Sequence, residues 1–297
     1  MTNIEPIVYV NGNWQPLSAA SVPVFDLGLW GLAATEMLRT WSGRPTLADR
    51  HVNRLLRSAT AIGVNTDAAH VPERDELVDI IHEAVERNSP LLTGGADLGI
   101  SIGLSAGVNT SMMPEADYSG TLSVIPFVLR PETWQHKLQN GQHLLTSSNV
   151  AVPSVAMPAS IKSRSRLHWR LAERDVKQRS ADAVPLLLDE DGFVTETSTS
   201  NVFVVRDNKL LTVAADVLGG ITASVVCEIA IAEALSIERV DLRPADLANA
   251  DEAFTTSSVI GICPVSRYDD QPIGNACPGP MTSRLTQAFH QFVCQSP

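Results

Sequence analysis

The sequence is poor in positive charge and contains no long apolar run. Its 22 lysines and arginines stand against 33 acids, which gives a formal net charge of −11. Because such a surface repels phosphate backbones, we expect no nucleic-acid partner. No segment approaches the roughly 18 to 20 apolar residues of a membrane span. The first residues, MTNIEPIVYV, also lack the basic start and apolar run of a signal peptide. We therefore expect no membrane partner and a cytoplasmic location.

Cysteines are few and show no metal-binding pattern. Cys227, Cys263, Cys277 and Cys294 lie in the C-terminal third, without a CxxC pair or a Cys/His spacing typical of zinc sites. They are predicted to be reduced thiols, and no metal site is predicted. The chain has 297 residues, of which 44% are hydrophobic, so it is long enough for one large domain or two modest ones.

Hydrophobic periodicity predicts helices and strands that are interleaved along the chain. The segment IVYVNGNWQP contains the Asn-Gly turn of a β-hairpin. Helical spacing is found in LADRHVNRLLRSATAIGV, where it stops at Gly63, at 73–87, at about 164–178, after GGIT at 219–222, and at about 281–293. Strands are predicted at 98–104, at 121–129, on both sides of the turn in 186–205, and at 210–213, 238–243 and 253–257.

The polar connector at residues 130–132 predicts a domain boundary. It separates an N-terminal domain, residues 1–129, from a C-terminal domain, residues 133–297. No repeat or low-complexity tract interrupts either part. The predicted fold class is α/β in the mixed sense, with two domains that each contain helices and a mixed sheet.

The motif GLSAG places Ser105 in a G-x-S-x-G pattern, which is typical of the nucleophile of serine hydrolases. That nucleophile requires a strand before it and a helix after it. Only the strand is predicted, because VNTSMMPEADYSG has the composition of a loop. The favoured interpretation is the end of a glycine- and serine-rich strand, and a hydrolase stays a distant alternative.

Lys162 lies at the end of an apolar segment, just before a predicted helix. Partial burial would lower the pKa of its amine and make it a nucleophile able to form a Schiff base. By position alone, however, a solvated basic face is the simpler interpretation, since Arg164, Arg166 and Arg170 follow closely.

Three weak signals fit one ligand. GGIT at 219–222 places two glycines before a helix start, which can bind a phosphate or form an ordinary capped loop. TTSS at 255–258 ends a strand with four hydroxyls, and Glu196 is an acid between apolar strands. Together with Lys162, these residues suit pyridoxal 5′-phosphate (PLP), whose aldehyde, phosphate and ring nitrogen need an amine, a phosphate site and a carboxylate.

In this order the segments resemble the class IV aminotransferases. These are the fold-type IV PLP enzymes, which include branched-chain aminotransferases, D-amino-acid aminotransferases and aminodeoxychorismate lyases. The resemblance covers nearly the whole chain. It is carried by VYVNGNWQP, FDLGLWGLAATEMLRT, HVNRLLRSA, Lys162, LLLDEDGFVTETSTSNVFVV, VLGGIT and AFTTSSVIGICPV. It implies a smaller N-terminal domain, a larger C-terminal PLP-binding domain, and a homodimer in which N-terminal loops of one subunit close the other's site.

The resemblance also implies roles for individual residues. Lys162 would be the catalytic Schiff-base lysine, and the other cofactor contacts would be Arg54, Glu196, Leu218, Ile221, Thr222 and Ser258. Arg54, Ile221, Thr222 and Ser258 would bind the phosphate, Glu196 would pair with the ring nitrogen, and Leu218 would pack on the ring. The substrate would lie among Trp30, Thr35, Arg166 and Val259.

Several positions depart from the family pattern and leave the substrate open. Thr35 replaces an aromatic residue, and LGISIGLSAG has no arginine where relatives carry one. Arg166 either faces the substrate carboxylate or lies on the helix exterior. We predict a branched-chain-aminotransferase-like enzyme that moves an amino group between an amino acid and a 2-oxo acid. The alternatives are an aminodeoxychorismate lyase, a D-amino-acid aminotransferase, the serine hydrolase and a non-catalytic PLP-binding protein.

Overall fold

The computed structural model describes residues 4–65, 71–109, 111, 113 and 118–295. Two compact units make up the chain. Unit 1 comprises Met1–Leu129 and Ile161–Arg166, and unit 2 comprises Arg130–Ser160 and Leu167–Gln295. Each unit combines helices with a sheet, so the predicted mixed α/β class is confirmed. Within the described ranges, no helix has both the length and the apolar character that a membrane crossing requires.

Unit 1 is built around a six-stranded sheet. Its elements are β1 (Ile7–Val10), β2 (Asn13–Pro16), β3 (Ala33–Trp41), β4 (Arg44–Pro45), α1 (Ala48–Ala61), α2 (Arg74–Arg87), β5 (Leu98–Ser105) and β6 (Leu122–Val128). The strand order is β2-β1-β6-β5-β3-β4, with all neighbours antiparallel. The predicted hairpin is present, and Asn11 and Gly12 take the positive φ angles that its tight turn needs.

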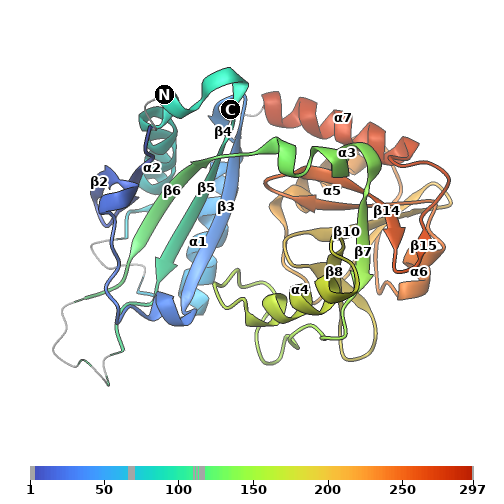
Figure 1. Ribbon diagram of the computed structural model, residues 1–297, viewed down its shortest axis with the longest axis horizontal. Helices are drawn as coiled ribbons and strands as arrows, with labels where there is room; N and C mark the ends of the chain where they lie inside the picture. Colours follow the sequence, from blue (N-terminus) through green and yellow to red (C-terminus); the bar gives the residue numbers. More distant parts are fainter. Residues whose placement is uncertain (1–3, 66–70, 110, 112, 114–117, 296–297) are drawn as a thin grey trace. The chain divides into compact units, whose positions relative to one another are not determined.

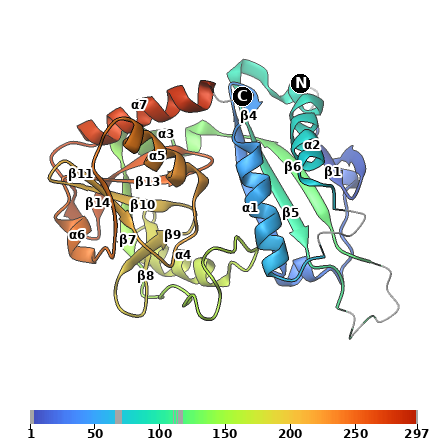
Figure 2. The ribbon, with the colours of Figure 1, turned by 180° about the vertical axis from the view of Figure 1, so that it is seen from behind.

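Helices α1 and α2 cover one face of this sheet, as Figures 1 and 2 show. Both were predicted from their apolar spacing, and the residues that face the sheet, such as Val52, Leu55 and Leu77, are fully buried. Along β5, buried residues such as Ile100 and Ile102 alternate with residues that point to the other face. The helices therefore enclose an apolar core on one side and leave the other side of the sheet uncovered by α1 and α2.

The segment before α4 (Leu167–Arg179) pairs with the sheet of unit 1. A helix was predicted from about residue 164, so the predicted start is three residues too early. Ser163 forms an antiparallel β-bridge with Ala34 of β3. Because this pairing holds the backbone extended, the helix begins only after it.

Unit 2 contains a nine-stranded sheet in which parallel and antiparallel pairs are mixed. The strand order is β12-β11-β10-β13-β14-β7-β8-β9, and β15 pairs with β14. Besides α4, its elements are α3 (Gln135–Asn140), β7 (Gln142–Thr146), β8 (Val184–Leu188), β9 (Val194–Thr197), β10 (Asn201–Arg206), β11 (Lys209–Val213), α5 (Ile221–Ala232), β12 (Ile237–Val240), α6 (Pro244–Ala248), β13 (Glu252–Ser257), β14 (Gly261–Tyr268), β15 (Gln271–Pro272) and α7 (Pro280–Gln295).

Strands β10 and β13 form the buried centre of unit 2. They are antiparallel neighbours, and Phe203 and Phe254 stack there with ring centroids 5.0 Å apart. Helices α5 and α7 pack on each other and on β13. The predicted strands around the 189–192 turn are confirmed as β8 and β9. This arrangement brings the end of β9, the start of β10, the loop before α5 and the end of β13 close together.

Candidate active site

A buried acid on β3 joins this strand to helix α1. Glu36 is 1% exposed. Its Oε1 accepts a hydrogen bond from Arg54 Nε at 2.6 Å, and its Oε2 accepts one from Arg54 Nη2 at 2.8 Å. His51 Nδ1 lies 2.8 Å from the same Oε2. Since His51 and Arg54 are three residues apart on α1, both side chains leave the helix on the same face.

These contacts keep the Glu36 carboxyl ionised. Burial alone would raise its pKa, but hydrogen bonds from Arg54 and His51 outweigh burial and lower the pKa from 4.5 to about 2. Burial lowers the pKa of His51, and this effect is larger than the increase caused by Glu36. The charges of Arg54 and Lys162 lower the pKa further. At neutral pH the network therefore holds a carboxylate, a guanidinium and a neutral imidazole whose Nδ1–H donates to Glu36.

The backbone of Lys162 is held between α1 and β3. Its N–H donates to Ser58 Oγ at 3.1 Å, and its carbonyl accepts from the Thr35 N–H at 2.9 Å. Ser58 lies one helical turn after Arg54 on α1. The half-buried Lys162 is therefore anchored beside the Glu36 network, and its charge acts on the pKa of His51.

In unit 2, Glu196 lies on β9 and contacts the loop that precedes α5. Its Oε2 accepts hydrogen bonds from the Leu218 N–H at 3.2 Å and from Asn201 Nδ2 at 3.4 Å. Asn201 also donates to the Leu218 carbonyl at 2.8 Å. Asn201 thus fixes the position of the loop relative to the acid.

Helix α5 starts without a side-chain cap. Gly220 occupies the N-cap position and has no side chain that could accept a hydrogen bond from the first N–H groups of the helix. A Cβ at Gly220 would lie 1.9 Å from Asn201 Oδ1, whereas a Cβ at Gly219 would meet nothing within 4 Å. Glycine is therefore required at position 220, whereas the space around position 219 is open.

The end of β13 supplies hydroxyls to the same framework. Thr256 is 2% exposed, and among the residues that the structure describes its Oγ1 has no hydrogen-bond partner. Thr256 pairs with Asn201 across the β10–β13 ladder. Ser258 and Val259 follow in the half-buried turn after the strand. A buried hydroxyl without a partner is a site that a ligand can complete.

The residues of unit 2 fit PLP. The uncapped start of α5 provides N–H groups and the positive end of a helix dipole, which suit a phosphate. The unpaired Thr256 hydroxyl adds a further donor beside β10. Glu196 provides the carboxylate that a protonated ring nitrogen needs. Unit 1 separately provides the anchored Lys162 and the Arg54 guanidinium.

The residues predicted around the substrate are distributed over several segments. Trp30 ends a short 3-10 helix, Leu27–Trp30, and is 57% exposed. Thr35 lines a cavity of unit 1, and its backbone contacts Lys162. Arg166 is partly exposed just before α4, and Val259 is half-buried in unit 2. The structure brings Thr35 and Lys162 together, and the roles of the four residues stay predictions.

Ser105 has a structural contact instead of a catalytic neighbourhood. Its Oγ donates to Asp26 Oδ2 at 2.9 Å and accepts from the Thr121 N–H at 2.8 Å. Tyr118 and the Thr121 hydroxyl donate to the same oxygen, each at 2.6 Å. Across residues 106–109 no helix follows the strand. The G-x-S-x-G motif therefore ends β5, as the favoured interpretation predicted.

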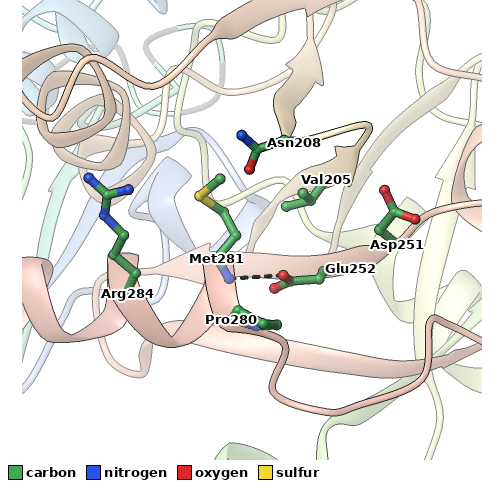
Figure 3. A pocket seen from close by; sticks show the side chains of 7 residues that line it. All are labelled: Val205, Asn208, Asp251, Glu252, Pro280, Met281 and Arg284. Atoms are coloured by element: carbon green, nitrogen blue, oxygen red, sulfur yellow. Dashed lines mark hydrogen bonds between the residues drawn. The ribbon is translucent and has the colours of Figure 1, made fainter.

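A second cavity lies in unit 2, and two of its lining residues, Glu252 and Met281, form a helix-capping contact (Figure 3). Glu252 accepts hydrogen bonds from the N–H groups of Met281 and Thr282 at the start of α7, both at 2.8 Å. Arg284 pairs with Glu233 at 2.6 Å. Glu252 and Arg284 thus hold α7 in place, and the third charged residue of the lining, Asp251, accepts a hydrogen bond from the Asp207 N–H at 2.8 Å.

Glu36, His51 and Asn201 were not predicted as functional residues. Glu36 lies within FDLGLWGLAATEMLRT, one of the segments that resemble the family. His51 lies three residues before Arg54, a spacing that puts both side chains on one face of a helix. A charged residue in a strand is more often solvent-exposed than buried. Only the packing of β3 on α1 shows that this acid is the partner of the two basic side chains.

We expect the stability of unit 1 to depend on pH through Glu36. The lowered pKa contributes roughly 3 kcal/mol to the free energy of unfolding above pH 4.5, and this contribution is lost as the pH falls toward 2. Glu36→Gln should be less stable at pH 7 by a similar amount and should lose this part of the acid dependence. Urea unfolding between pH 7 and pH 2 measures both effects.

The exposed Glu86→Gln serves as the control for this experiment, because the Glu86 side chain makes no hydrogen bond or ion pair within the described residues. It should follow the parent protein at every pH. Equal stability of Glu36→Gln and the parent at pH 7 would show that the buried network does not stabilise unit 1.

The chain was compared with known proteins. A family model for amino-transferase class IV matches residues 33–268. Branched-chain-amino-acid aminotransferase-like protein 2 of Arabidopsis thaliana is 27% identical over 292 residues, which cover 98% of this chain. This chain spans about half (51%) of the length of that relative. D-alanine aminotransferase of Bacillus licheniformis is 28% identical, with 96% of each chain covered.

The fold is also similar to solved structures. A branched-chain amino acid aminotransferase of T.th. with pyridoxamine 5′-phosphate superimposes with a TM-score of 0.85, at 27% identity, over 98% of this chain and 94% of that chain. The predicted fold type and the predicted cofactor, PLP, are confirmed at the level of the family. The chain belongs to the class IV aminotransferases, a family of PLP-dependent enzymes.

Proposed function

We propose that the protein transfers an amino group between an amino acid and a 2-oxo acid, with Lys162 as the catalytic residue. The observation that carries the proposal is the anchoring of Lys162 between Ser58 and Thr35, beside the buried Glu36 network. Because its backbone is fixed from two elements, the amine can be held in one position. Ordered placement of the reacting group is a main source of rate in enzymes.

The other predicted residues bind and orient the cofactor in this proposal. Arg54, held rigid by Glu36, and the α5 start bind the phosphate, while Glu196 holds a proton on the ring nitrogen. When bound, PLP would be held by the Lys162 amine and would supply an electron sink for the substrate Cα. Once the substrate amine has displaced it, Lys162 Nζ would be free to act as the general base that accepts the Cα proton and returns it to the opposite end of the transfer.

The substrate class within the family stays a proposal. The branched-chain relative and the T.th. structure support a branched-chain-like enzyme, and the D-alanine aminotransferases support the opposite chirality. An aminodeoxychorismate lyase would use the same lysine and cofactor but would release pyruvate. A cytoplasmic location rests on the sequence alone.

Lys162→Ala should abolish both the visible absorbance of the PLP-loaded protein and amino transfer. The substitution removes the amine that binds the aldehyde. Amino transfer to 2-oxoglutarate from L-leucine and from D-alanine, followed by chiral chromatography of the glutamate formed, measures activity and chirality together.

Lys177→Ala, which replaces an exposed lysine on α4, is the control and should behave as the parent. A parent protein without a PLP band would contradict the proposal, and Lys162-dependent pyruvate release would indicate the lyase.

Glu196→Gln should retain the PLP absorbance but slow amino transfer by roughly 100-fold or more, because the ring nitrogen loses its protonating partner. Single-turnover kinetics of the loaded protein separate this slow step from weaker binding. Glu190→Gln, an exposed acid of the neighbouring turn, provides the matched control. Near-normal turnover of Glu196→Gln would remove this residue from the mechanism.

A homodimer is proposed from the resemblance and from an exposed apolar segment. Residues 22–32 expose Val22, Val24, Leu29, Trp30 and Leu32, by between 42% and 83% of each side chain. Apolar groups gathered in this way are typical of a protein interface. Sedimentation velocity should show a dimer for the parent and a monomer for Val24→Asp, with Val155→Asp, in unit 2, as the control. A monomeric parent would contradict the proposal.

A further inference from the structure

The sheet face of unit 1 that points away from α1 contains a cavity of about 230 Å³. Its lining is unusually rich in hydroxyl groups for a ligand cavity. The hydroxyls come from Thr35, Ser101, Ser105, Thr121 and Ser123. The apolar side chains are those of Val22, Leu29, Ala33 and Ile125, and the remaining lining residues are Asp26, Gly28, Ile102, Gly103 and Arg164.

The strand register explains why this cavity lies next to Lys162. Thr35 is opposite Gly103 on β5, and Gly103 is opposite Ser123 on β6, so the three form one row across the sheet. The Thr35 N–H donates to the Lys162 carbonyl, which extends the same row by one residue. Because Gly103 has no side chain, the cavity is deeper there, between the hydroxyl residues Thr35 and Ser123.

A second row places Arg164 at the edge of the cavity. The Arg164 N–H donates to the Ala33 carbonyl at 2.7 Å, and Ala33 is opposite Ser105. Arg164 is two residues from Lys162, and in an extended chain this separation is roughly 7 Å. A carboxylate bound by Arg164 can therefore belong to the same small molecule as a group that reaches Lys162.

Among the described residues that line this cavity, Arg164 is the only basic one. Among the described residues, its guanidinium has no ion pair or hydrogen bond. Asp26 contributes the opposite charge, but it is fully buried and accepts hydrogen bonds from the Gly28 N–H and from the hydroxyls of Ser105, Tyr118 and Thr121. Its charge is thus stabilised by donors of its own.

Three of the hydroxyl residues remain available to a ligand. Within the described part of the chain, the hydroxyls of Thr35, Ser101 and Ser123 make no hydrogen bond, and all three residues are partly exposed. A guanidinium with neighbouring hydroxyls suits a carboxylate, since each oxygen can accept two hydrogen bonds. A purely apolar side chain would leave these donors without a partner.

We propose that Arg164 binds a carboxylate of the substrate in this cavity and thereby selects carboxylate-bearing amino and 2-oxo acids. The inference rests on the proposed function for the identity of the substrate. It assigns the carboxylate to Arg164 and not to Arg166, which does not line the cavity. The same chemistry can come from the carboxylate at Cα or from a second carboxylate on the side chain.

The test uses the PLP-loaded full chain and three variants. Arg164→Ala removes the guanidinium, Arg164→Lys keeps the charge without the planar fork, and Arg170→Ala removes an exposed arginine of α4 as the control. Calorimetric titration with glutarate measures binding without turnover. Amino transfer from glutamate and from norvaline to suitable 2-oxo acids measures kcat/KM, and thermal unfolding confirms that the variants fold.

Arg164→Ala is expected to weaken glutarate binding and to lower kcat/KM by roughly 10- to 100-fold, with Arg164→Lys intermediate and Arg170→Ala unchanged. An equal loss for glutamate and norvaline assigns Arg164 to the carboxylate at Cα, and a loss for glutamate alone assigns it to the second carboxylate. Both results support the proposal. It is overturned if the parent does not bind glutarate, or if Arg164→Ala and Arg170→Ala behave alike.

Carboxylate binding by Arg164 and the proposed amino transfer can be refuted separately. Glutarate binding that depends on Arg164, in a protein that transfers no amino group, would keep this inference and refute the proposed function. Amino transfer that is insensitive to Arg164→Ala would do the reverse.

Discussion

The buried carboxylate of Glu36 connects the elements on which the rest of unit 1 depends. It accepts two hydrogen bonds from Arg54 and one from His51, so that a strand and a helix are joined by charge-assisted contacts in a nearly water-free position. Removing one member of such a group leaves the others buried without a partner, which is costly. The same helix and the same strand hold Lys162 through Ser58 and Thr35. The stability of unit 1 and the position of the Lys162 backbone therefore depend on the same helix and the same strand.

Unit 2 differs from unit 1 because some of its polar groups lack hydrogen-bond partners within the described residues. The α5 start has no side-chain cap, and the Thr256 hydroxyl has no partner within the described residues. Asn201 meanwhile holds the loop before α5 beside Glu196. Polar groups that are buried without partners destabilise a fold unless a ligand completes them. In the proposed function, a phosphorylated cofactor would complete both features.

The two faces of the sheet in unit 1 differ in character for a simple geometric reason. Side chains alternate along each strand, so β5 directs Ile100 and Ile102 to the helices and Ser101 and Gly103 to the other face. The sequence pattern LGISIGLS already contains this alternation. Its consequence is an apolar core on one side and a hydroxyl-lined cavity on the other.

The sequence by itself determined the fold class, most helices, the hairpins and the family, because these depend on local periodicity and on motifs that are contiguous in the chain. It did not predict β3, whose alternation is hidden by two charged residues, Glu36, which pairs with Arg54, and Arg39, which pairs with Asp97. Nor did it predict the late start of α4, which follows from the pairing of Ser163 with Ala34. The partner of Arg54 and the place of Arg164 in a cavity were decided only by tertiary structure. They depend on strand register and helix packing, which bring together residues that are far apart in the sequence.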